Sequence, residues 1–444
     1  MRGLIVAAPA SGSGKTLVTL GLLRYLANSG EKVVSAKVGP DYIDPAFHAV
    51  ASGQPCRNLD AWAMRDETLN TVLSGLSDDG ELVVCEGVMG LFDGARVAPD
   101  TVSGSSADIA RKTNWPVVLI VDARAQAASA AAVVRGFIGH EPDVEIIGVI
   151  FNQIGGAEHA KILHSAITAS LPDIPVIGCL PRCEGLVLPS RHLGLVQALE
   201  HPDLEGFIDG AAKMIAAHLD VPTLLALARP VADTKAGNSG TAPLGQRIAI
   251  ARDAAFAFSY DHLLEGWRAA GAEIIPFSPL ADEAPAGSVD AVYLPGGYPE
   301  LHAGRLAANA TYLAGLRNAA VRGANLFGEC GGYMVLGQGM VDAKGVRHAM
   351  AGLLQLETSF ETPRLHLGYR SAALLADGFL GAAGKAFRGH EFHYASVLVE
   401  EGDKPLFLTT DAAGGNSGAA GLVDGNVAGS FIHLIDQETL PRSR

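Results

Sequence analysis

The sequence has few cysteines, few basic residues and no long apolar run. Its 5 cysteines among 444 residues are odd in number and widely spread, which favours a reducing compartment over a disulfide framework. Lys and Arg total 33 against 47 for Asp and Glu, giving a net charge of −14, which argues against nucleic-acid or anionic-membrane binding. No apolar run approaches the roughly 20 residues of a membrane span. These absences predict a cytoplasmic protein.

The residues that are present predict a large core and alternating strands and helices. Hydrophobic residues make up 48% of the chain and charged residues 18%, enough for a sizeable core. The length of 444 residues is enough for two or three domains. Continuous apolar runs predict buried parallel strands at Leu4–Ala7, Lys32–Val38, Leu82–Cys85, Val117–Val121 and Ile146–Phe151. Helical patterns lie between them at Leu17–Asn28 and Ala125–Phe137. This alternation indicates a doubly wound α/β domain.

The alternation stops near Leu219 and begins again at Arg247. The intervening segment is rich in Pro and Gly, which favours a linker over a long surface loop within one domain. Beyond it we expect a helix at Tyr260–Ala270 and strands at Arg247–Ala251, Glu273–Phe277, Ala291–Leu294 and Asn325–Phe327. The sequence therefore predicts an α/β domain in residues 1–220, a linker in 221–246 and a second α/β domain in 247–444.

A predicted phosphate-binding loop joins the first strand to the first helix. It contains Ser11, Gly12, Ser13, Gly14, Lys15 and Thr16. Backbone N–H groups and the helix N-terminus would bind the phosphates of ATP, with Lys15 at the β- and γ-phosphates and the Thr16 hydroxyl on Mg²⁺. The loop departs from the usual P-loop pattern because Pro9 occupies the position of its first glycine.

Charged side chains follow the next two predicted strands. Lys37, Asp41 and Asp44 follow the second strand, and Glu86 and Asp93 follow the third. The carboxyl ends of parallel strands meet at one edge of a sheet, so these groups should lie near the phosphate loop. We expect magnesium ligands among the carboxylates. For each carboxylate, the alternative is a helix cap or a turn.

A second site is predicted around Cys330. The segment Gly328–Gly332 follows a strand and has the form of a nucleophile elbow, in which glycines permit a sharp turn that exposes the side chain. The expected position at a helix N-terminus predicts a lowered thiol pKa.

This nucleophile also needs an oxyanion hole and a base. The N–H groups of Gly297 and Gly331 are candidates for the oxyanion hole. His433, His390 and His393 are candidates for the base, and spacing alone does not choose among them.

Taken together, these motifs make the chain resemble the cobyrinic acid and hydrogenobyrinic acid a,c-diamide synthases of cobalamin biosynthesis. The resemblance covers nearly the whole length. It rests on Ala8–Thr16, Lys37–Pro45, Glu86–Gly94, Leu180–Leu195, Leu294–Glu300, Gly328–Gly332, Gly389–Ser396 and Ser430–His433. The N-terminal half resembles dethiobiotin synthetase, and the C-terminal half resembles class I glutamine amidotransferases.

The resemblance implies a reaction with ATP, Mg²⁺ and L-glutamine. Cys330, with His433 as its base, would release ammonia from glutamine. The P-loop domain would phosphorylate the a and c acetate groups of hydrogenobyrinic acid or cobyrinic acid, and ammonia would then form the amides. We favour the metal-free substrate, hydrogenobyrinic acid. A homodimer is compatible with the family.

The resemblance also implies roles for individual residues. Lys37 would meet the transferring phosphate, and Thr16, Asp41 and Glu86 are the expected metal ligands. Residues expected to face phosphate or substrate are Lys37, Tyr42, Asp44, Asp93 and Arg191. Many class I amidotransferases carry Glu two residues after the catalytic His, but this chain has Ile435 there, so the third member of the site is unassigned.

Two other functions fit parts of the sequence. A related synthase could amidate a metallo-sirohydrochlorin on equivalent acetates. Alternatively, the P-loop half could be a partitioning-type ATPase switch joined to a degenerate amidotransferase domain. The intact Gly328–Gly332 elbow argues against the switch.

Overall fold

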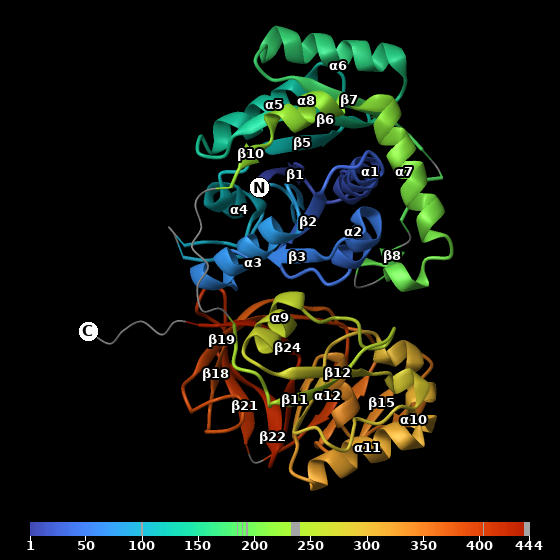
Figure 1. The fold of residues 1–444 in the computed structure, drawn as a ribbon, viewed down its shortest axis with the longest axis vertical. Helices are drawn as coiled ribbons and strands as arrows, with labels where there is room; N and C mark the ends of the chain where they lie inside the picture. Colours follow the sequence, from blue (N-terminus) through green and yellow to red (C-terminus); the bar gives the residue numbers. More distant parts are fainter. Residues whose placement is uncertain are drawn as a thin grey trace, which may run out of the picture. The chain divides into compact units, whose positions relative to one another are not determined.

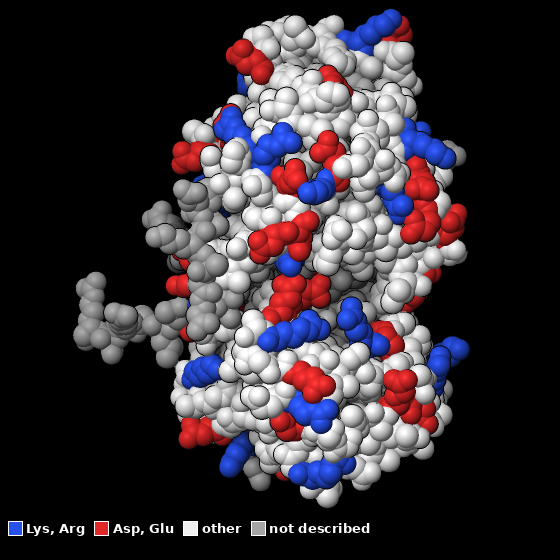
Figure 2. Space-filling view, in the orientation of Figure 1, with Lys and Arg blue, Asp and Glu red and all other residues white. Residues whose placement is uncertain are grey.

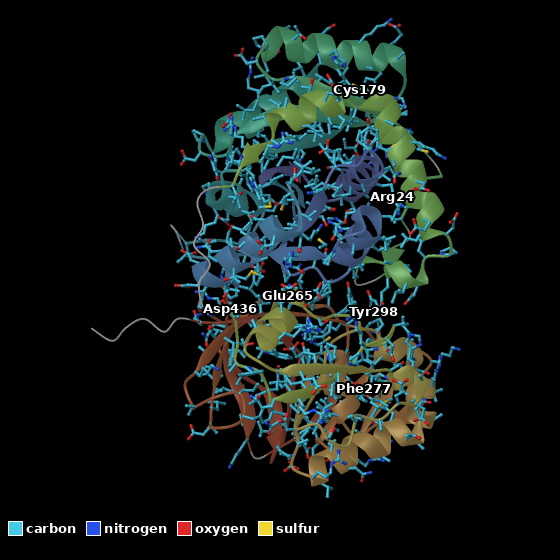
Figure 3. All side chains as sticks on the ribbon, in the orientation of Figure 1. Arg24, Cys179, Glu265, Phe277, Tyr298 and Asp436 are labelled. Carbon is cyan, nitrogen blue, oxygen red and sulfur yellow. The ribbon has the colours of Figure 1, made fainter. Side chains whose placement is uncertain are left out.

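The computed structural model describes residues 1–98, 101–183, 185–188, 190–191, 194–231, 240–402 and 404–438. The described chain forms two compact units (Figure 1). The first contains residues up to 231 except for two short segments, 63–68 and 96–98. Those segments group with the second unit, which otherwise starts at residue 240 among the described residues. Within the second unit, Arg65 forms an ion pair of 2.9 Å with the buried Asp436, which Figure 3 labels.

The first unit is built on a sheet of eight strands in the order β3-β2-β4-β1-β5-β6-β7, with β10 paired to β1. Seven strands run parallel and β10 is antiparallel to β1. Their bounds are β1 (Arg2–Ala7), β2 (Val33–Val38), β3 (Cys56–Leu59), β4 (Leu82–Glu86), β5 (Val117–Asp122), β6 (Ile146–Ile154), β7 (Val176–Pro181) and β10 (Arg229–Pro230). β2 and β4 are buried along their whole length, as expected for strands covered on both faces.

Helices cover both faces of this sheet because the chain runs outward from β1 in both directions, and right-handed crossovers in opposite directions lie on opposite faces. They are α1 (Lys15–Asn28), α2 (Asp44–Ser52), α3 (Asp66–Asp79), α4 (Ser106–Thr113), α5 (Ser129–His140), α6 (Ala157–Ser170), α7 (Leu204–His218) and α8 (Val221–Leu227). Figure 1 shows α7 lying beside α1. The predicted doubly wound α/β fold is confirmed. The helix expected at Ala125–Phe137 starts later, at Ser129, because Ala125 has a left-handed φ of 56°.

The predicted linker differs from the structure in its first half. Val221–Leu227 is helix α8, and Arg229–Pro230 is strand β10. The Asp220 side chain caps α8 by accepting from the Thr223 N–H, and Pro222 stands in its first turn. Proline at a helix start is favourable, so this proline starts a helix and does not break one. Residues 232–239 of the predicted linker lie outside the described residues.

The second unit contains a mixed sheet of ten strands in the order β12-β11-β13-β14-β23-β22-β21-β18-β19-β24. The first five are parallel to one another, and the rest pair antiparallel. Their bounds are β11 (Arg247–Ala251), β12 (Glu273–Phe277), β13 (Ala291–Leu294), β14 (Asn325–Glu329), β18 (His366–Leu374), β19 (Ala386–His393), β21 (Pro405–Asp411), β22 (Gly418–Asp424), β23 (Val427–Ser430) and β24 (Ile432–Gln437).

Smaller elements complete the second unit. The helices α9 (Asp261–Ala269), α10 (Ala303–Ala308), α11 (Ala310–Val321) and α12 (Gly331–Leu336) accompany the parallel strands. A further sheet has the order β16-β15-β17-β20, with bounds β15 (Gly339–Val341), β16 (Arg347–Ala349), β17 (Leu356–Ser359) and β20 (Ser396–Glu400). The core below the large sheet includes Ala249, Val292, Leu294, Leu326 and Tyr333, all fully buried.

In the first unit, Trp115 is a large buried side chain that packs directly against strand β1. Its ring is 1% exposed and lies against Gly3 of β1, where a Cβ atom would come within 2.4 Å of it. We expect Trp115→Ala to destabilise the chain by about 3–5 kcal/mol because it leaves a large cavity. Ile162→Ala, at a half-exposed position of α6, should change stability far less. Urea unfolding followed by circular dichroism checks this, and equal shifts would contradict it.

Candidate active sites

The loop between β1 and α1 has the backbone geometry of a phosphate-binding loop. Gly12 and Gly14 have left-handed φ values of 78° and 97°, which glycine adopts without strain. A Cβ atom at Gly14 would lie 2.1 Å from the Asn152 amide. That amide donates to the Ser13 carbonyl at 2.9 Å and so fixes the loop from the end of β6. Asn152 was not identified from the sequence, where an asparagine after a strand carried no distinct signal.

Lys15 begins α1 and reaches across the loop. Its ammonium group donates to the carbonyl oxygens of Met89 and Ala10. Burial lowers its pKa to about 8, against the opposing effect of Glu86. A partly desolvated cation surrounded by carbonyl oxygens is suited to bind a phosphate oxygen.

Glu86, the last residue of β4, is the centre of a buried polar cluster. It is 0% exposed. Its Oε1 atom accepts from the Thr16 hydroxyl at 2.7 Å and from Lys37 at 2.8 Å. Lys37 also donates to Asp44 at 2.5 Å. The structure thus brings together four of the predicted site residues, from α1, β2, α2 and β4.

The pKa values in this cluster follow from burial opposed by opposite charges. Burial alone would raise the pKa of Glu86, but Lys37 and His48 outweigh it and hold that pKa well below its usual range. Burial lowers the pKa of Lys37, but Asp44 and Glu86 outweigh it and raise it. Burial and the nearby Asp41 raise the pKa of Asp44 to about 7. Lys37 and Glu86 are therefore a charged pair.

His48 is a member of this cluster that sequence reasoning missed. Its Nε2 atom lies 2.7 Å from Oε2 of Glu86, and its Nδ1 atom lies 3.4 Å from the Cys56 thiol. The side chain is fully buried. Burial lowers its pKa, but Cys56 and Glu86 outweigh it and raise it to about 10. His48 fixes the orientation of the Glu86 carboxylate, and no motif in the sequence marked it.

The remaining predicted residues of the first site have mixed environments. The Oδ1 atom of Asp41 accepts from the N–H groups of Ile43 and Asp44 at the start of α2, while Oδ2 lies 4.0 Å from Lys37. Asp93 is exposed, and its Oδ2 atom accepts from the Gly90 N–H. Both carboxylates therefore also act as turn or cap residues, the alternative that the sequence left open.

The last two predicted residues of this site are Tyr42 and Arg191. Tyr42 is half-buried directly after Asp41. Arg191 belongs to the two-residue strand β8 (Ser190–Arg191), and its side chain is outside the described atoms. The neighbouring His192 lies outside the described residues.

Cys330 occupies a sharp turn between β14 and α12. Its φ is 47° and ψ is −104°, a strained conformation for a residue with a side chain. A Cβ atom at Gly332 would lie 1.9 Å from the Leu294 carbonyl oxygen, and one at Gly328 would lie 2.7 Å from Gly332. The predicted elbow geometry is present, since the glycines permit this close approach.

The expected lowered pKa of the Cys330 thiol is wrong for this structure. Burial raises its pKa well above the ordinary value, and Glu300 adds to that effect. The N–H of Gly331 acts in the opposite direction but is outweighed. The six-residue helix α12 does not overcome desolvation. The thiol is therefore neutral, and it needs a base.

His433 on β24 lies next to the nucleophile turn. β14 pairs with β23 so that Glu329 is opposite Ser430, and the Cys330 N–H donates to the Ser430 carbonyl at 2.8 Å. His433 is 0% exposed. Burial, with added effects of His390 and His393, lowers its pKa to about 3. A buried neutral imidazole can act as a general base toward a neutral thiol.

The other two histidines belong to the neighbouring strand β19. His390 lies opposite His433 in the sheet. His393 stacks on Phe431 at 3.9 Å between ring centroids, and its Nε2 atom lies 3.1 Å from Glu391. Phe392, between these histidines, has its carbonyl oxygen 4.0 Å from the Cys330 sulfur. β19 therefore forms one wall of the site.

The predicted oxyanion residues lie close together. A Cβ atom at Gly331 would lie 3.1 Å from the Gly297 nitrogen, and one at Gly297 would lie 2.1 Å from the Ala255 carbonyl oxygen. Tyr298, labelled in Figure 3, follows this turn and packs edge-on against Phe258 at 5.0 Å between centroids. The backbones of Gly297 and Gly331 thus approach closely, as an oxyanion hole formed by their two N–H groups requires.

One cluster of the second unit could hold a metal ion. Its members are His366, Glu391 and His393, with ligand atoms within 4.8 Å of one another. Arg370 already forms an ion pair with Glu391 at 2.7 Å, which a cation would have to displace. In the first unit, the Thr16 hydroxyl and the Glu86 carboxylate are oxygen ligands of the kind that Mg²⁺ prefers.

Comparisons with known proteins match both units. Residues 4–196 match the CobQ/CobB/MinD/ParA nucleotide binding domain, and residues 247–439 match the CobB/CobQ-like glutamine amidotransferase domain. A hydrogenobyrinate a,c-diamide synthase of Brucella anthropi is 52% identical over 98% of this chain and 99% of that protein. Proteins of the same name from a Sinorhizobium species and Rhizobium meliloti are 52% and 51% identical, with the same coverage of both chains. The chain belongs to the hydrogenobyrinate a,c-diamide synthase family.

This membership confirms the predicted pairing of a P-loop domain with a class I amidotransferase-like domain. The matched ranges correspond to the two units described above. Among the described residues of this family member, no helix is both long and apolar enough to cross a bilayer. On the face drawn in Figure 2, basic and acidic side chains are intermixed.

Lys37 offers a test of the buried cluster. We expect Lys37→Met to destabilise the chain by about 3–5 kcal/mol, because it removes the buried cation that pairs with both Glu86 and Asp44. Lys32→Met is the matched control, since that lysine is 73% exposed and pairs with an exposed Glu81. Urea unfolding measures the free energy of unfolding of both variants. An equally small decrease for the two substitutions would show that Lys37 is not needed to hold the cluster.

Proposed function

We propose that this chain amidates the a and c acetate carboxylates of hydrogenobyrinic acid, using ATP and L-glutamine, in cobalamin biosynthesis. The observation that carries the proposal is full-length identity of 50–52% to proteins named hydrogenobyrinate a,c-diamide synthase. The phosphate loop at Gly12–Thr16 and the Cys330 elbow, one in each unit, supply the two chemistries that such a reaction needs.

In the second unit, Cys330 attacks the side-chain amide carbon of glutamine while His433 takes the thiol proton. The N–H groups of Gly297 and Gly331 stabilise the oxyanion. The imidazolium then gives its proton to the leaving nitrogen, and ammonia departs. Water hydrolyses the remaining thioester to glutamate and restores the thiol.

In the first unit, a carboxylate of the corrinoid attacks the γ-phosphate of ATP and forms an acyl phosphate and ADP. Lys15 and Lys37 neutralise charge on the transferring phosphoryl group. The Lys15 ammonium lies in the phosphate loop, where it donates to the Ala10 carbonyl, and Lys37 donates to Glu86 at 2.8 Å. Ammonia attacks the acyl carbon and phosphate leaves. This activation is needed because a carboxylate is a poor electrophile, and it takes place once for each acetate.

Mg²⁺ completes this proposal at the first site. Thr16 and Glu86 would hold it, with Asp41 on the same edge of the sheet. The ion supplies Lewis-acid neutralisation of the phosphate oxygens when bound. Glu86 already accepts from Thr16, Lys37 and His48, so ligation through water needs the least rearrangement.

The finer assignments also belong to the proposal. Tyr42, Asp44, Asp93 and Arg191 face the corrinoid or the acyl phosphate. We place the reaction in the cytoplasm, supported by five cysteines that are all free thiols. A homodimer is proposed only on the family resemblance.

The first experiment separates this function from its alternatives. The purified chain is supplied with ATP, Mg²⁺, glutamine and, in parallel, hydrogenobyrinic acid, cobyrinic acid or nickel sirohydrochlorin, and products are read by mass spectrometry. We expect two amides on hydrogenobyrinic acid, each replacing one hydroxyl by one amino group. A product on nickel sirohydrochlorin alone would move the chain to the metallo-sirohydrochlorin synthases.

Two controls make the result specific. Cys330→Ser should lose amidation with glutamine and retain it with ammonium chloride, since only the second unit is impaired. Lys15→Ala should lose amidation with either nitrogen source and retain glutamine hydrolysis. If ATP induces association of the chain but no variant or substrate yields any amide or glutamate, the ATPase switch is the better explanation.

A further inference from the structure

Glu329, the residue directly before Cys330, lies between the nucleophile strand and the strand of His433. It is 2% exposed. Its Oε2 atom accepts from the Tyr293 hydroxyl at 2.6 Å, and its Oε1 atom accepts from the Leu434 N–H at 3.0 Å. Leu434 follows His433 directly, so the second bond fixes the backbone that carries the imidazole.

The same carboxylate faces one nitrogen of the His433 ring. Oε2 of Glu329 lies 3.9 Å from Nδ1. A Cβ atom at Gly296 would lie 2.2 Å from Cε1, 3.0 Å from Nε2 and 3.3 Å from Nδ1, so close packing against Gly296 holds the ring in place. Of the two ring nitrogens, Nδ1 is the one that lies near the carboxylate, which leaves Nε2 for proton transfer. In hydrolases that pair a nucleophile with histidine, an acid at Nδ1 selects this tautomer.

We propose that Glu329 is the positioning residue of the glutaminase site. Its carboxylate, 3.9 Å from Nδ1 of His433, favours the proton on that nitrogen and stabilises the imidazolium that forms when Nε2 takes the Cys330 proton. This inference rests on the proposed function. Glu329 takes the role of the acid that many class I amidotransferases carry two residues after the catalytic His. This chain has Ile435 at that position, and its apolar side chain can accept no hydrogen bond. The sequence position is different because the carboxylate comes from the nucleophile strand β14 and not from the strand of the base.

Burial determines the charges of both groups before the reaction. Burial raises the pKa of Glu329 to about 7 and lowers that of His433 to about 3. When the proton moves from Sγ to Nε2, the electron pair stays on sulfur and the total charge is unchanged. The new imidazolium then lies next to a carboxylate that it keeps ionised. Below pH 7 the carboxyl becomes protonated and no longer stabilises the imidazolium.

Glu329→Gln tests this role with little structural change. The glutamine oxygen can still accept from the Leu434 N–H, and its amide can donate to the Tyr293 oxygen. We expect kcat for glutamine hydrolysis to fall about 100-fold or more with KM within about threefold. Amidation driven by ammonium chloride and the melting temperature should not change. If the unaltered chain shows no amidation with ammonium chloride, that result would instead count against the proposed function.

The pH profile separates positioning from simple structural support. In the unaltered chain, kcat/KM for glutamine should rise through pH 7, and Glu329→Gln should abolish that limb. The other titratable groups that face the pair are Tyr293, Cys330, His390 and His393. Tyr293→Phe is the matched control: it removes a hydrogen bond to the same oxygen but keeps the charge, so it should retain the limb.

A second measurement needs no substitution of Glu329. In spectra of the protein labelled with ¹⁵N-histidine, the His433 signal, assigned by its loss in His433→Asn, should show the Nδ1–H tautomer. The Nε2–H tautomer would overturn the proposal. So would a Glu329→Gln variant with kcat within about twofold of the unaltered chain and the same pH profile. If the Glu329→Gln variant does not fold, the tautomer of His433 in the unaltered chain tests the proposal by itself.

Discussion

A carboxylate that is removed from water must be given hydrogen-bond donors or cations by the groups around it. Both sites of this chain are arranged around such a group, placed at the carboxyl end of a parallel strand. Glu86 ends β4 and holds Thr16, Lys37 and His48 together. Glu329 ends β14 and joins Tyr293 to the backbone beside His433. Each carboxylate gathers side chains from elements that are distant in the sequence.

Close backbone approach makes these buried clusters possible. Gly14 leaves room for the Asn152 amide, and Gly296 leaves room for the His433 ring. In both places the neighbouring group is a polar side chain that must keep one orientation to be useful. Removing a Cβ atom lets the fold hold that orientation by packing as well as by hydrogen bonds. These glycines therefore help to position the polar side chains of the two sites, in addition to forming turns.

Much of the architecture could be predicted from the sequence, because buried parallel strands are continuous apolar runs. The strands β1, β2, β4, β5 and β6 were found this way, whereas the short strand β3 was missed. The elbow at Cys330 was found from the glycines on either side of the cysteine. The antiparallel strands β18 to β22 were not, because they are partly exposed and interrupted by turns, as in the half-exposed β18. His48 and Glu329 were missed as site residues for a different reason. Their roles depend on partners tens of residues away, which no local pattern encodes.

The order of the elements along the chain has a consequence for synthesis on the ribosome. Cys330 follows β14, whereas His433 belongs to β24, which is made only after the antiparallel strands β18 to β22. β23, which pairs with β14, and the strand of His433 are translated last among the described strands. In a growing chain, the Cys330 thiol is therefore synthesised long before its base, His433. It gains the means to break down glutamine only when the ATP-binding unit that uses the ammonia has already been translated.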